Sequence, residues 1–225
     1  MIDRADIDEW VIFPEGMISG YAPEDPDYIR KLNKEALFSA ISSIQYRAMQ
    51  RKCHCIIGTA LPADPVMNAA LHINAVTSEQ TYYKVNLDAL DRQHFTPGTA
   101  LHIFTMKEGR FGIQMGSELL FPEQWKALKH NGAALILHLN NTLEPADRVW
   151  GHAIITRALE TQSFVCSVNT AESRALSSYL VSPAGDVLLE APPGEERLLS
   201  TNIDLSQART DLLQMERTDL VKLIY

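Results

Sequence analysis

Residues 112–123 read Gly112-Ile113-Gln114-Met115-Gly116-Ser117-Glu118-Leu119-Leu120-Phe121-Pro122-Glu123 and lead from a predicted strand into a predicted helix. The apolar side chains ahead of Gly116 favour a buried strand over 111–115. Proline suits the first turn of a helix and an acidic residue suits the positive end of the helix dipole, so the Pro-Glu pair predicts a helix over 122–131. Gly116 is therefore expected in the turn between a buried strand and a helix.

Strands alternate with helices over the rest of the chain. Apolar residues recur at helical spacing from Asp27 to Lys52, which predicts one amphipathic helix over 27–52. The other predicted elements are strands at 9–13, 53–59, 69–76, 81–85, 101–106, 133–139, 164–168, 176–182, 186–190 and 198–203, a helix at 146–162, and a terminal helix from Asp204. This order predicts a layered α/β protein with mixed sheets. Since no repeat or Pro/Gly-rich linker interrupts it, residues 1–225 are expected to form one domain.

The composition is that of a soluble globular protein. Of 225 residues, 46% are hydrophobic and 21% are charged, with 20 basic against 28 acidic side chains and a net charge of −8. An acidic chain without blocks of Lys or Arg argues against nucleic acid as a partner, and no apolar run reaches the ~20 residues that cross a bilayer. The start, Met1 to Asp6, lacks the basic and apolar segments of a signal peptide, so a cytoplasmic location is expected.

Three cysteines, Cys53, Cys55 and Cys166, are expected to be free thiols because the chain shows no secretory signal. Cys53 and Cys55 lie two apart in a predicted strand, so their thiols face one side and His54 faces the other. Two thiols on one face can begin a zinc site, but no second Cys/His pair accompanies them, and packing is the better interpretation. No metal ion or other cofactor is predicted.

Four segments resemble the carbon-nitrogen hydrolase family, also called the nitrilase superfamily. Residues 11–21, Val-Ile-Phe-Pro-Glu-Gly-Met-Ile-Ser-Gly-Tyr, are similar to its strand, Pro-Glu and Ser/Thr-Gly-Tyr pattern, and residues 82–87, Tyr-Tyr-Lys-Val-Asn-Leu, are similar to Tyr-Arg-Lys-x-x-Leu. Residues 112–123 are similar to Gly-x-x-Ile-Cys-Tyr-Asp-x-x-Phe-Pro-Glu, and residues 157–162, Arg-Ala-Leu-Glu-Thr-Gln, match Arg-Ala-x-Glu-Asn-x. The resemblance covers nearly the whole chain and implies the family's four-layer α-β-β-α sandwich.

The resemblance also implies a Glu, Lys and Cys active site, whose first two roles fall on Glu15 and Lys84. In the family the thiol attacks an amide or nitrile carbon, the Glu acts as general base and then acid, and the Lys stabilises developing negative charge. A second carboxylate of the family corresponds to Asp91, which is one methylene shorter than Glu. The nucleophile position falls on Gly116, which has no side chain to form the acyl intermediate. Since loss of the nucleophile costs a serine hydrolase on the order of a millionfold in turnover, we predict that this route is closed.

Two interpretations of function follow. In the first, the chain is a catalytically silent homologue that keeps a pocket for a small amide, nitrile or carboxylate, with Ser117 and Asn140 as candidate ligand contacts. In the second, it is a working amide hydrolase with a relocated nucleophile, either Ser117 or a water activated by Glu15. A shift of one residue reverses a side chain's direction in a strand, and a hydroxyl needs stronger activation than a thiol, so we favour the first. A retained Glu15 and Lys84 pair also fits a structural role, because each buried charge compensates the other.

The family usually has a further strand and helix before the strand that leads to Glu15, and no matching residues stand in this sequence. We therefore expect an N-terminally shortened sandwich, with a sheet edge or core face that a partner subunit or a rearranged terminus would cover. An engineered change or a sequence error at position 116 would explain the missing cysteine but not this shortening. The family commonly dimerises through helices near the nucleophile turn, here 122–131 with Trp125 and Leu128. A homodimer or larger homo-oligomer is expected.

Overall fold

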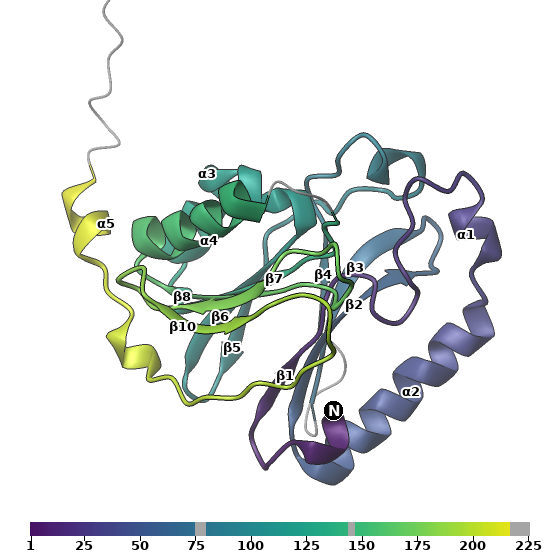
Figure 1. Cartoon of the computed structure of the whole chain (residues 1–225), viewed down its shortest axis with the longest axis horizontal. Helices are drawn as coiled ribbons and strands as arrows, with labels where there is room; N and C mark the ends of the chain where they lie inside the picture. Colours follow the sequence, from purple (N-terminus) through teal and green to yellow (C-terminus); the bar gives the residue numbers. More distant parts are fainter. Residues whose placement is uncertain (75–79, 144–146, 217–225) are drawn as a thin grey trace, which may run out of the picture.

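Two β-sheets pack face to face in the computed structural model, which describes residues 1–74, 80–143 and 147–216 (Figure 1). The first sheet has the order β1-β2-β3-β4, formed by Trp10–Ile12, His54–Leu61, Met67–Ile73 and Gln80–Tyr83. The second has the order β10-β9-β8-β7-β6-β5, formed by Val187–Ala191, Ser178–Val181, Phe164–Val168, Leu135–Leu139, Gly109–Met115 and Ile103–Met106. β1 is parallel to β2, and β6, β7 and β8 are parallel to one another, so both sheets are mixed as predicted.

Helices cover the two outer faces and complete the α-β-β-α order. α2 lies against the first sheet, and α3 and α4 lie against the second (Figure 1). These helices span Lys34–Arg51, Pro122–His130 and Asp147–Thr161. Apolar clusters fill all three interfaces, around Ile57 under α2, Ile113 between the sheets, and Ile136 under α3 and α4. The predicted sandwich is confirmed, and most elements appear within a few residues of their predicted bounds.

The predicted helix over 27–52 is two helices. α1 (Tyr28–Lys31) ends at Leu32, whose backbone is extended, and α2 begins after Asn33. The Asn33 side chain accepts a hydrogen bond from the Ala36 amide at 3.0 Å, which is the contact of a helix N-cap. The apolar pattern continues through this point, but the cap starts a new helix.

Two predictions near the C-terminal end are wrong. Within the described ranges, residues 198–203 belong to no strand, and Ile203 instead packs beside the layer between the sheets. The helix predicted from Asp204 is broken into the 3-10 turn η4 (Leu205–Gln207) and α5 (Asp211–Met215). The Arg209 amide binds the carbonyl of Gln162 at 3.0 Å, which takes the chain out of the helical path. The end of the predicted strand 69–76, the start of the helix 146–162, and residues 217–225 lie outside the described residues.

The first residues of the chain fold back on α2, while β1 is the outer strand of its sheet. The 3-10 turn η1 (Ile2–Arg4) buries Ile2, and Ala5 is 1% exposed. The Arg51 guanidinium donates to the Ala5 carbonyl at 2.6 and 3.0 Å, and Arg47 pairs with Asp3 at 2.6 Å. This segment therefore covers part of the core face under α2.

The structure buries the two neighbouring cysteines and the apolar residues of α3. Cys53 and Cys55 are buried under α2, whereas His54 stacks on Trp10 on the other face of the sheet, so the packing interpretation is confirmed. Trp125 and Leu128 of α3 are 0% and 1% exposed and pack against the second sheet. They are not available to a partner, so the prediction that these two residues form a dimer contact is wrong.

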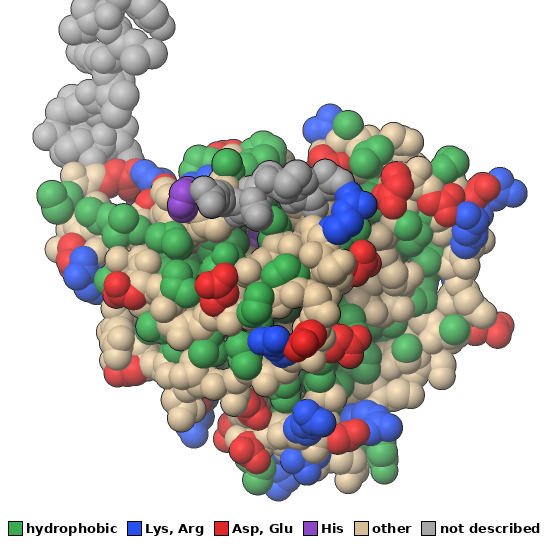
Figure 2. All heavy atoms as spheres, in the orientation of Figure 1, with side chains coloured by type: hydrophobic (Ala, Val, Ile, Leu, Met, Phe, Trp, Pro, Cys, Tyr) green, Lys and Arg blue, Asp and Glu red, His purple; other side chains and the backbone are tan. Residues whose placement is uncertain are grey.

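The molecular surface carries both signs of charge. Lys, Arg, Asp and Glu side chains are interspersed on the face shown in Figure 2, without a basic block. No helix in the described ranges is long and apolar enough to cross a bilayer.

Candidate functional site

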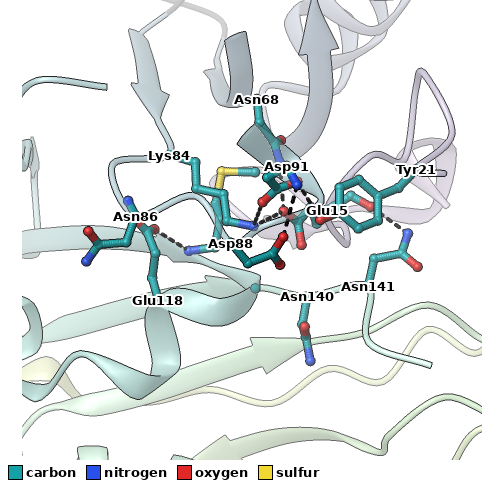
Figure 3. A network of polar contacts seen from close by, with 12 residues as sticks. Glu15, Tyr21, Asn68, Lys84, Asn86, Asp88, Asp91, Glu118, Asn140 and Asn141 are labelled. Atoms are coloured by element: carbon teal, nitrogen blue, oxygen red, sulfur yellow. Dashed lines mark hydrogen bonds and ion pairs between the residues drawn. The ribbon is translucent and has the colours of Figure 1, made fainter. Parts of the chain in front are cut away.

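Three charged side chains lie close to Gly116 where strands of the two sheets end (Figure 3). Glu15 lies in the turn after β1, and Lys84 directly follows β4. Asp91 begins the 3-10 turn η2 (Asp91–Gln93), and Gly116 begins the 3-10 turn η3 (Gly116–Leu120), directly after β6. The exposed fractions are 1% for Glu15, 1% for Lys84 and 0% for Asp91. The structure therefore brings the three predicted charged residues together in a site closed to water.

The Lys84 ammonium is the centre of this cluster. Its Nζ lies 2.9 Å from Glu15 Oε1 and 2.6 Å from Asp91 Oδ2. Asn68 Nδ2 donates to the same Glu15 oxygen at 2.9 Å, and the Tyr21 hydroxyl donates to Asp91 Oδ1 at 2.8 Å (Figure 3). Two carboxylates share one ammonium, so the cluster favours a proton on one of them.

The pKa shifts follow from burial and from this unequal pairing. Burial raises the pKa of Glu15; the Lys84 ammonium opposes that shift and the Asp91 carboxylate adds to it. Burial alone would lower the pKa of Lys84, but the two carboxylates outweigh it and raise that pKa. Glu15 therefore keeps its proton to a higher pH than a free carboxyl group, while Lys84 stays charged. Such a pair can donate a proton and stabilise negative charge on a bound group.

Contacts from both sheets fix the backbone at Glu15. β2 passes close beneath it, and a Cβ on Gly58 would lie 2.6 Å from the Cα of Glu15, so only glycine allows this approach. From the second sheet, Asn141 Nδ2 donates to the Glu15 carbonyl at 3.0 Å (Figure 3). The carboxyl group thus projects from a turn that is held on both sides.

Gly116 lies where the cluster meets η3. Its φ of +48° is in the left-handed region, which disfavours residues with a side chain. A Cβ at this position would lie 2.7 Å from Glu15 Oε2 and 2.9 Å from Lys84 Nζ. The absent side chain therefore points at the two groups that would activate a nucleophile and stabilise its product. The sequence supplies no nucleophilic atom at this point.

Glu118 holds η3 to the rest of the molecule. It is 0% exposed, and its carboxylate accepts hydrogen bonds from the amides of Met115, Val85 and Asn86 at 2.8, 2.8 and 3.0 Å. The Tyr82 hydroxyl donates to it at 2.9 Å. Burial raises the pKa of Glu118, and the hydrogen bonds oppose that shift. Glu118 stands at the acidic position of the third family-like segment, which is the signal that could have singled it out.

Three further residues of the site were missed by the sequence interpretation. Asn68 and His138 are polar residues within apolar strands, and each contacts the site, through Glu15 and through the carbonyl of Gly116 respectively. Tyr21 ends the first family-like segment. A polar side chain inside an apolar strand was a usable signal, but it does not reveal its partner.

The two predicted ligand contacts lie outside the ion cluster. The Ser117 hydroxyl is buried and has no hydrogen-bond partner within the described part of the chain, so no base activates it there. The Asn140 side chain accepts a hydrogen bond from the Thr142 hydroxyl at 2.7 Å and points away from Lys84 (Figure 3). Their neighbours, Gly116 and Asn141, are the residues that face or contact Glu15.

Two recesses of the surface lie away from the charged cluster. One recess of about 600 Å³ follows the outer face of α2, and another of about 130 Å³ lies beside Trp10. Neither is lined by the cluster residues. Within the ranges that the structure describes, no three His, Cys, Asp or Glu side chains form a group that could hold a metal ion.

Similar sequences point to one family. The carbon-nitrogen hydrolase family profile matches residues 9–211. The chain is 25% identical over 206 residues to an (R)-stereoselective amidase of a Pseudomonas species, covering 88% of this chain and 74% of that protein. It is 26% identical over 208 residues to a nitrilase of Pyrococcus abyssi, covering 88% of this chain and 78% of that protein.

Solved structures share the fold. A cysteine-to-alanine mutant of the Nesterenkonia AN1 amidase, from the nitrilase superfamily, superposes with a TM-score of 0.81 at 22% identity, covering 94% of this chain and 82% of that chain. A CN-hydrolase superfamily protein of Xanthomonas campestris, solved with an arsenic adduct in its active site, has a TM-score of 0.78 at 20% identity, covering 96% and 86%. With the match over residues 9–211, these findings show that the chain belongs to the carbon-nitrogen hydrolase family.

Proposed function

We propose that this protein binds a small amide at the Glu15, Lys84 and Asp91 cluster without cleaving it through a covalent intermediate. The observation that carries the proposal is Gly116, whose absent Cβ would lie within 3 Å of both Glu15 and Lys84. These distances support the assignment of Gly116 to the nucleophile position, and glycine supplies no reactive atom there. Without the thiol, the loss in turnover is on the order of a millionfold by analogy with a serine hydrolase.

A solved relative supports binding without a thiol. The Nesterenkonia amidase with its cysteine replaced by alanine has been determined in complex with butyramide. Gly116 of this chain has one carbon less than that alanine.

The charge of the cluster selects among the ligand classes. Two carboxylates already compete for Lys84, so an anionic carboxylate ligand would add a third negative group to a site closed to water. A neutral amide offers a carbonyl to Lys84 and an N–H group to Glu15 without adding charge. We therefore favour an amide over a carboxylate, with Asp91 holding Lys84 in place. A nitrile is also neutral but lacks the N–H donor.

The ligand must displace part of the wall to reach the cluster. Tyr21 and Asn141 are half-buried, and their side chains reach Asp91 and the Glu15 carbonyl. Movement of the turn that carries Tyr21 would open a path without breaking the Lys84 ion pairs. Access is expected through this side.

Binding and turnover measured together test the proposal. Butyramide binding is followed by ligand-observed NMR, and ammonia release is measured from a panel of small amides and nitriles, with Glu15→Gln as the matched variant. We expect butyramide to bind and ammonia release to equal that of the variant. Release at ordinary enzymatic rates that is lost in Glu15→Gln would overturn the proposal, and so would an absence of binding.

The intact ion cluster favours a second candidate, an amide hydrolase with a relocated nucleophile. Lys84 remains placed to stabilise negative charge, and Glu15 remains placed to move a proton. The serine route is poorly served, because the Ser117 hydroxyl has no hydrogen-bond partner among the described residues that could act as its base. Ammonia release that survives in the wild type and disappears in Ser117→Ala would select the serine route.

The proposal also includes the oligomeric state of the protein. We infer a homodimer that uses the outer surface around η3, α3 and α4, where Leu120 of η3 and Val149 of α4 are 57% and 68% exposed. Light scattering on the wild type and on Leu120→Glu checks this: we expect a dimer in the first and a monomer in the second.

A further inference from the structure

Side chains from three different elements hold the carbonyl groups of η3. His138 Nε2, on β7, lies 2.9 Å from the carbonyl oxygen of Gly116. Trp125 Nε1, on α3, donates to the Glu118 carbonyl at 2.9 Å, and Arg157 Nε, on α4, donates to the Leu119 carbonyl at 2.9 Å. Trp125 and Arg157 bind carbonyls further along η3, so His138 is the donor that acts on Gly116 itself.

The partners of His138 determine its tautomer. A carbonyl oxygen only accepts hydrogen bonds, so Nε2 carries a proton and donates it to Gly116. Full burial lowers the pKa of His138 to about 4, so the ring is neutral near pH 7 and Nδ1 is an acceptor. The Ser167 hydroxyl, 2.9 Å from Nδ1, therefore donates to it. The result is a chain of hydrogen bonds from Ser167 through His138 to Gly116.

These hydrogen-bonded residues lie on neighbouring strands of the second sheet. His138 on β7 stands opposite Ser167 on β8 and Gln114 on β6, two residues before Gly116. The three strands are parallel, so their ordered register fixes where the imidazole meets the turn. Movement of Gly116 away from β7 would lengthen this hydrogen bond and change the position of the turn relative to Glu15 and Lys84.

We propose that His138, oriented by Ser167, is a positioning residue of the ligand site that keeps Gly116 against Glu15 and Lys84. Its effect on ligand affinity rests on the proposed function, whereas its effect on the turn does not. His138 touches the backbone of Gly116 and not the ion cluster, so it acts through the turn.

The test compares matched variants of β7. His138→Leu removes both hydrogen bonds, and His138→Gln keeps one donor. Leu137→Ala removes a neighbouring core side chain that is 1% exposed and packs in the apolar layer between the sheets. Hydrogen exchange is measured at the Met115 and Phe121 amides, which bind Glu118 at 2.8 and 3.2 Å, with the Ile136 amide of β7 as the reference.

In His138→Leu the turn amides are expected to exchange about tenfold faster relative to Ile136, and butyramide to bind about tenfold more weakly, as for a lost buried hydrogen bond. His138→Gln should recover part of both effects, and Leu137→Ala should leave the exchange ratio unchanged. Nitrogen-15 NMR should show the Nε2–H tautomer in the wild type.

An unchanged exchange ratio in His138→Leu, or an Nδ1–H tautomer in the wild type, would overturn the proposal. If His138→Leu does not fold, Ser167→Ala decides by the same ratio, because it removes the donor that orients the ring. If the wild type does not bind butyramide, the proposed function fails while the exchange ratio still decides the role of His138.

Discussion

Glu15 and Glu118 are two buried glutamates that meet opposite surroundings. Glu15 shares the Lys84 ammonium with Asp91 and receives one further side-chain hydrogen bond, from Asn68. Glu118 has no ion pair among the described residues, and its carboxylate is instead surrounded by three backbone amides and the Tyr82 hydroxyl. The first depends on a charge balance that a proton can alter. The second depends on donors that are part of the fold.

The difference explains how the turn at Gly116 can persist without a nucleophile. Glu118 ties η3 to the segment after β4 through the amides of Val85 and Asn86, and none of these contacts involves a reactive group. The geometry of the turn is therefore maintained by folding energetics alone. A well-formed turn next to Glu15 and Lys84 is not in itself a sign of catalysis.

The largest loss of stability is expected when Lys84, the cation that pairs with Glu15, is removed. Lys84→Met leaves the Glu15 and Asp91 carboxylates buried without a counter-charge, which should cost about 3–5 kcal/mol of unfolding free energy. Glu15→Gln added to Lys84→Met should restore part of the loss, because it removes one of the two carboxylates. Urea unfolding at neutral pH checks this, and a loss below about 1 kcal/mol would contradict the central role of Lys84.

Replacing the other glutamate should cost about 2–4 kcal/mol. In Glu118→Gln the amide NH₂ group must face at least one backbone N–H that now binds a carboxylate oxygen, and two donors cannot pair. Urea unfolding of Glu118→Gln and Glu15→Gln side by side provides the check. Equal losses of unfolding free energy in the two variants would show that the different surroundings of Glu118 and Glu15 do not affect stability.

A methyl group at the nucleophile position should cost about 1–3 kcal/mol. Gly116→Ala adds the strain of a left-handed residue and a contact 2.7 Å from Glu15 Oε2. Gly185→Ala is the control, because Gly185 has a φ of +88° but its Cβ would meet nothing nearer than 3.6 Å. The difference between the unfolding temperatures of the two variants measures the cost of the contact with Glu15 and Lys84. Equal unfolding temperatures would mean that these two side chains move aside without a loss of stability.

The smallest effect, about 0.5–1 kcal/mol, is expected for Glu15→Gln, and it should depend on pH. Since the folded state raises the pKa of Glu15 above its ordinary 4.5, the wild type binds this proton more tightly when folded. Its contribution to stability is complete below pH 4.5 and declines as the pH rises through the raised pKa. Glutamine imitates the protonated form, so the variant should gain stability relative to the wild type as the pH rises. Urea unfolding from pH 4.5 upwards should show this trend, and the opposite trend would refute the charge assignment.

Hydrophobic periodicity and the family-like segments predict most of the fold, because strands and helices of a layered protein carry their burial pattern in the sequence. The break at Asn33 is not visible in that pattern, since apolar residues continue through it and only the side-chain cap interrupts the helix. Residues 198–203 have a strand-like composition but find no strand partner among the described residues. Periodicity records burial, and it does not record which hydrogen bonds form.

The sequence predicted part of the site through the family resemblance. The resemblance placed Glu15, Lys84 and Asp91 in one site, and the structure joins them through ion pairs. It could not reveal His138, because the role of that residue depends on strand register across β6, β7 and β8. Trp125 was assigned to a dimer contact because an apolar residue on a helix does not reveal which surface it covers.

The most direct test of an intact site that lacks its nucleophile is intact-mass analysis after incubation with fluoroacetamide. This reagent adds to the active-site cysteine of a Nesterenkonia amidase mutant, and here it is applied to the wild type, Gly116→Cys and Ser117→Cys. We predict a single adduct on Gly116→Cys and none on the wild type, whose three cysteines serve as the internal control, or on Ser117→Cys. An unmodified Gly116→Cys, or an adduct on the wild type or on Ser117→Cys, would contradict the account.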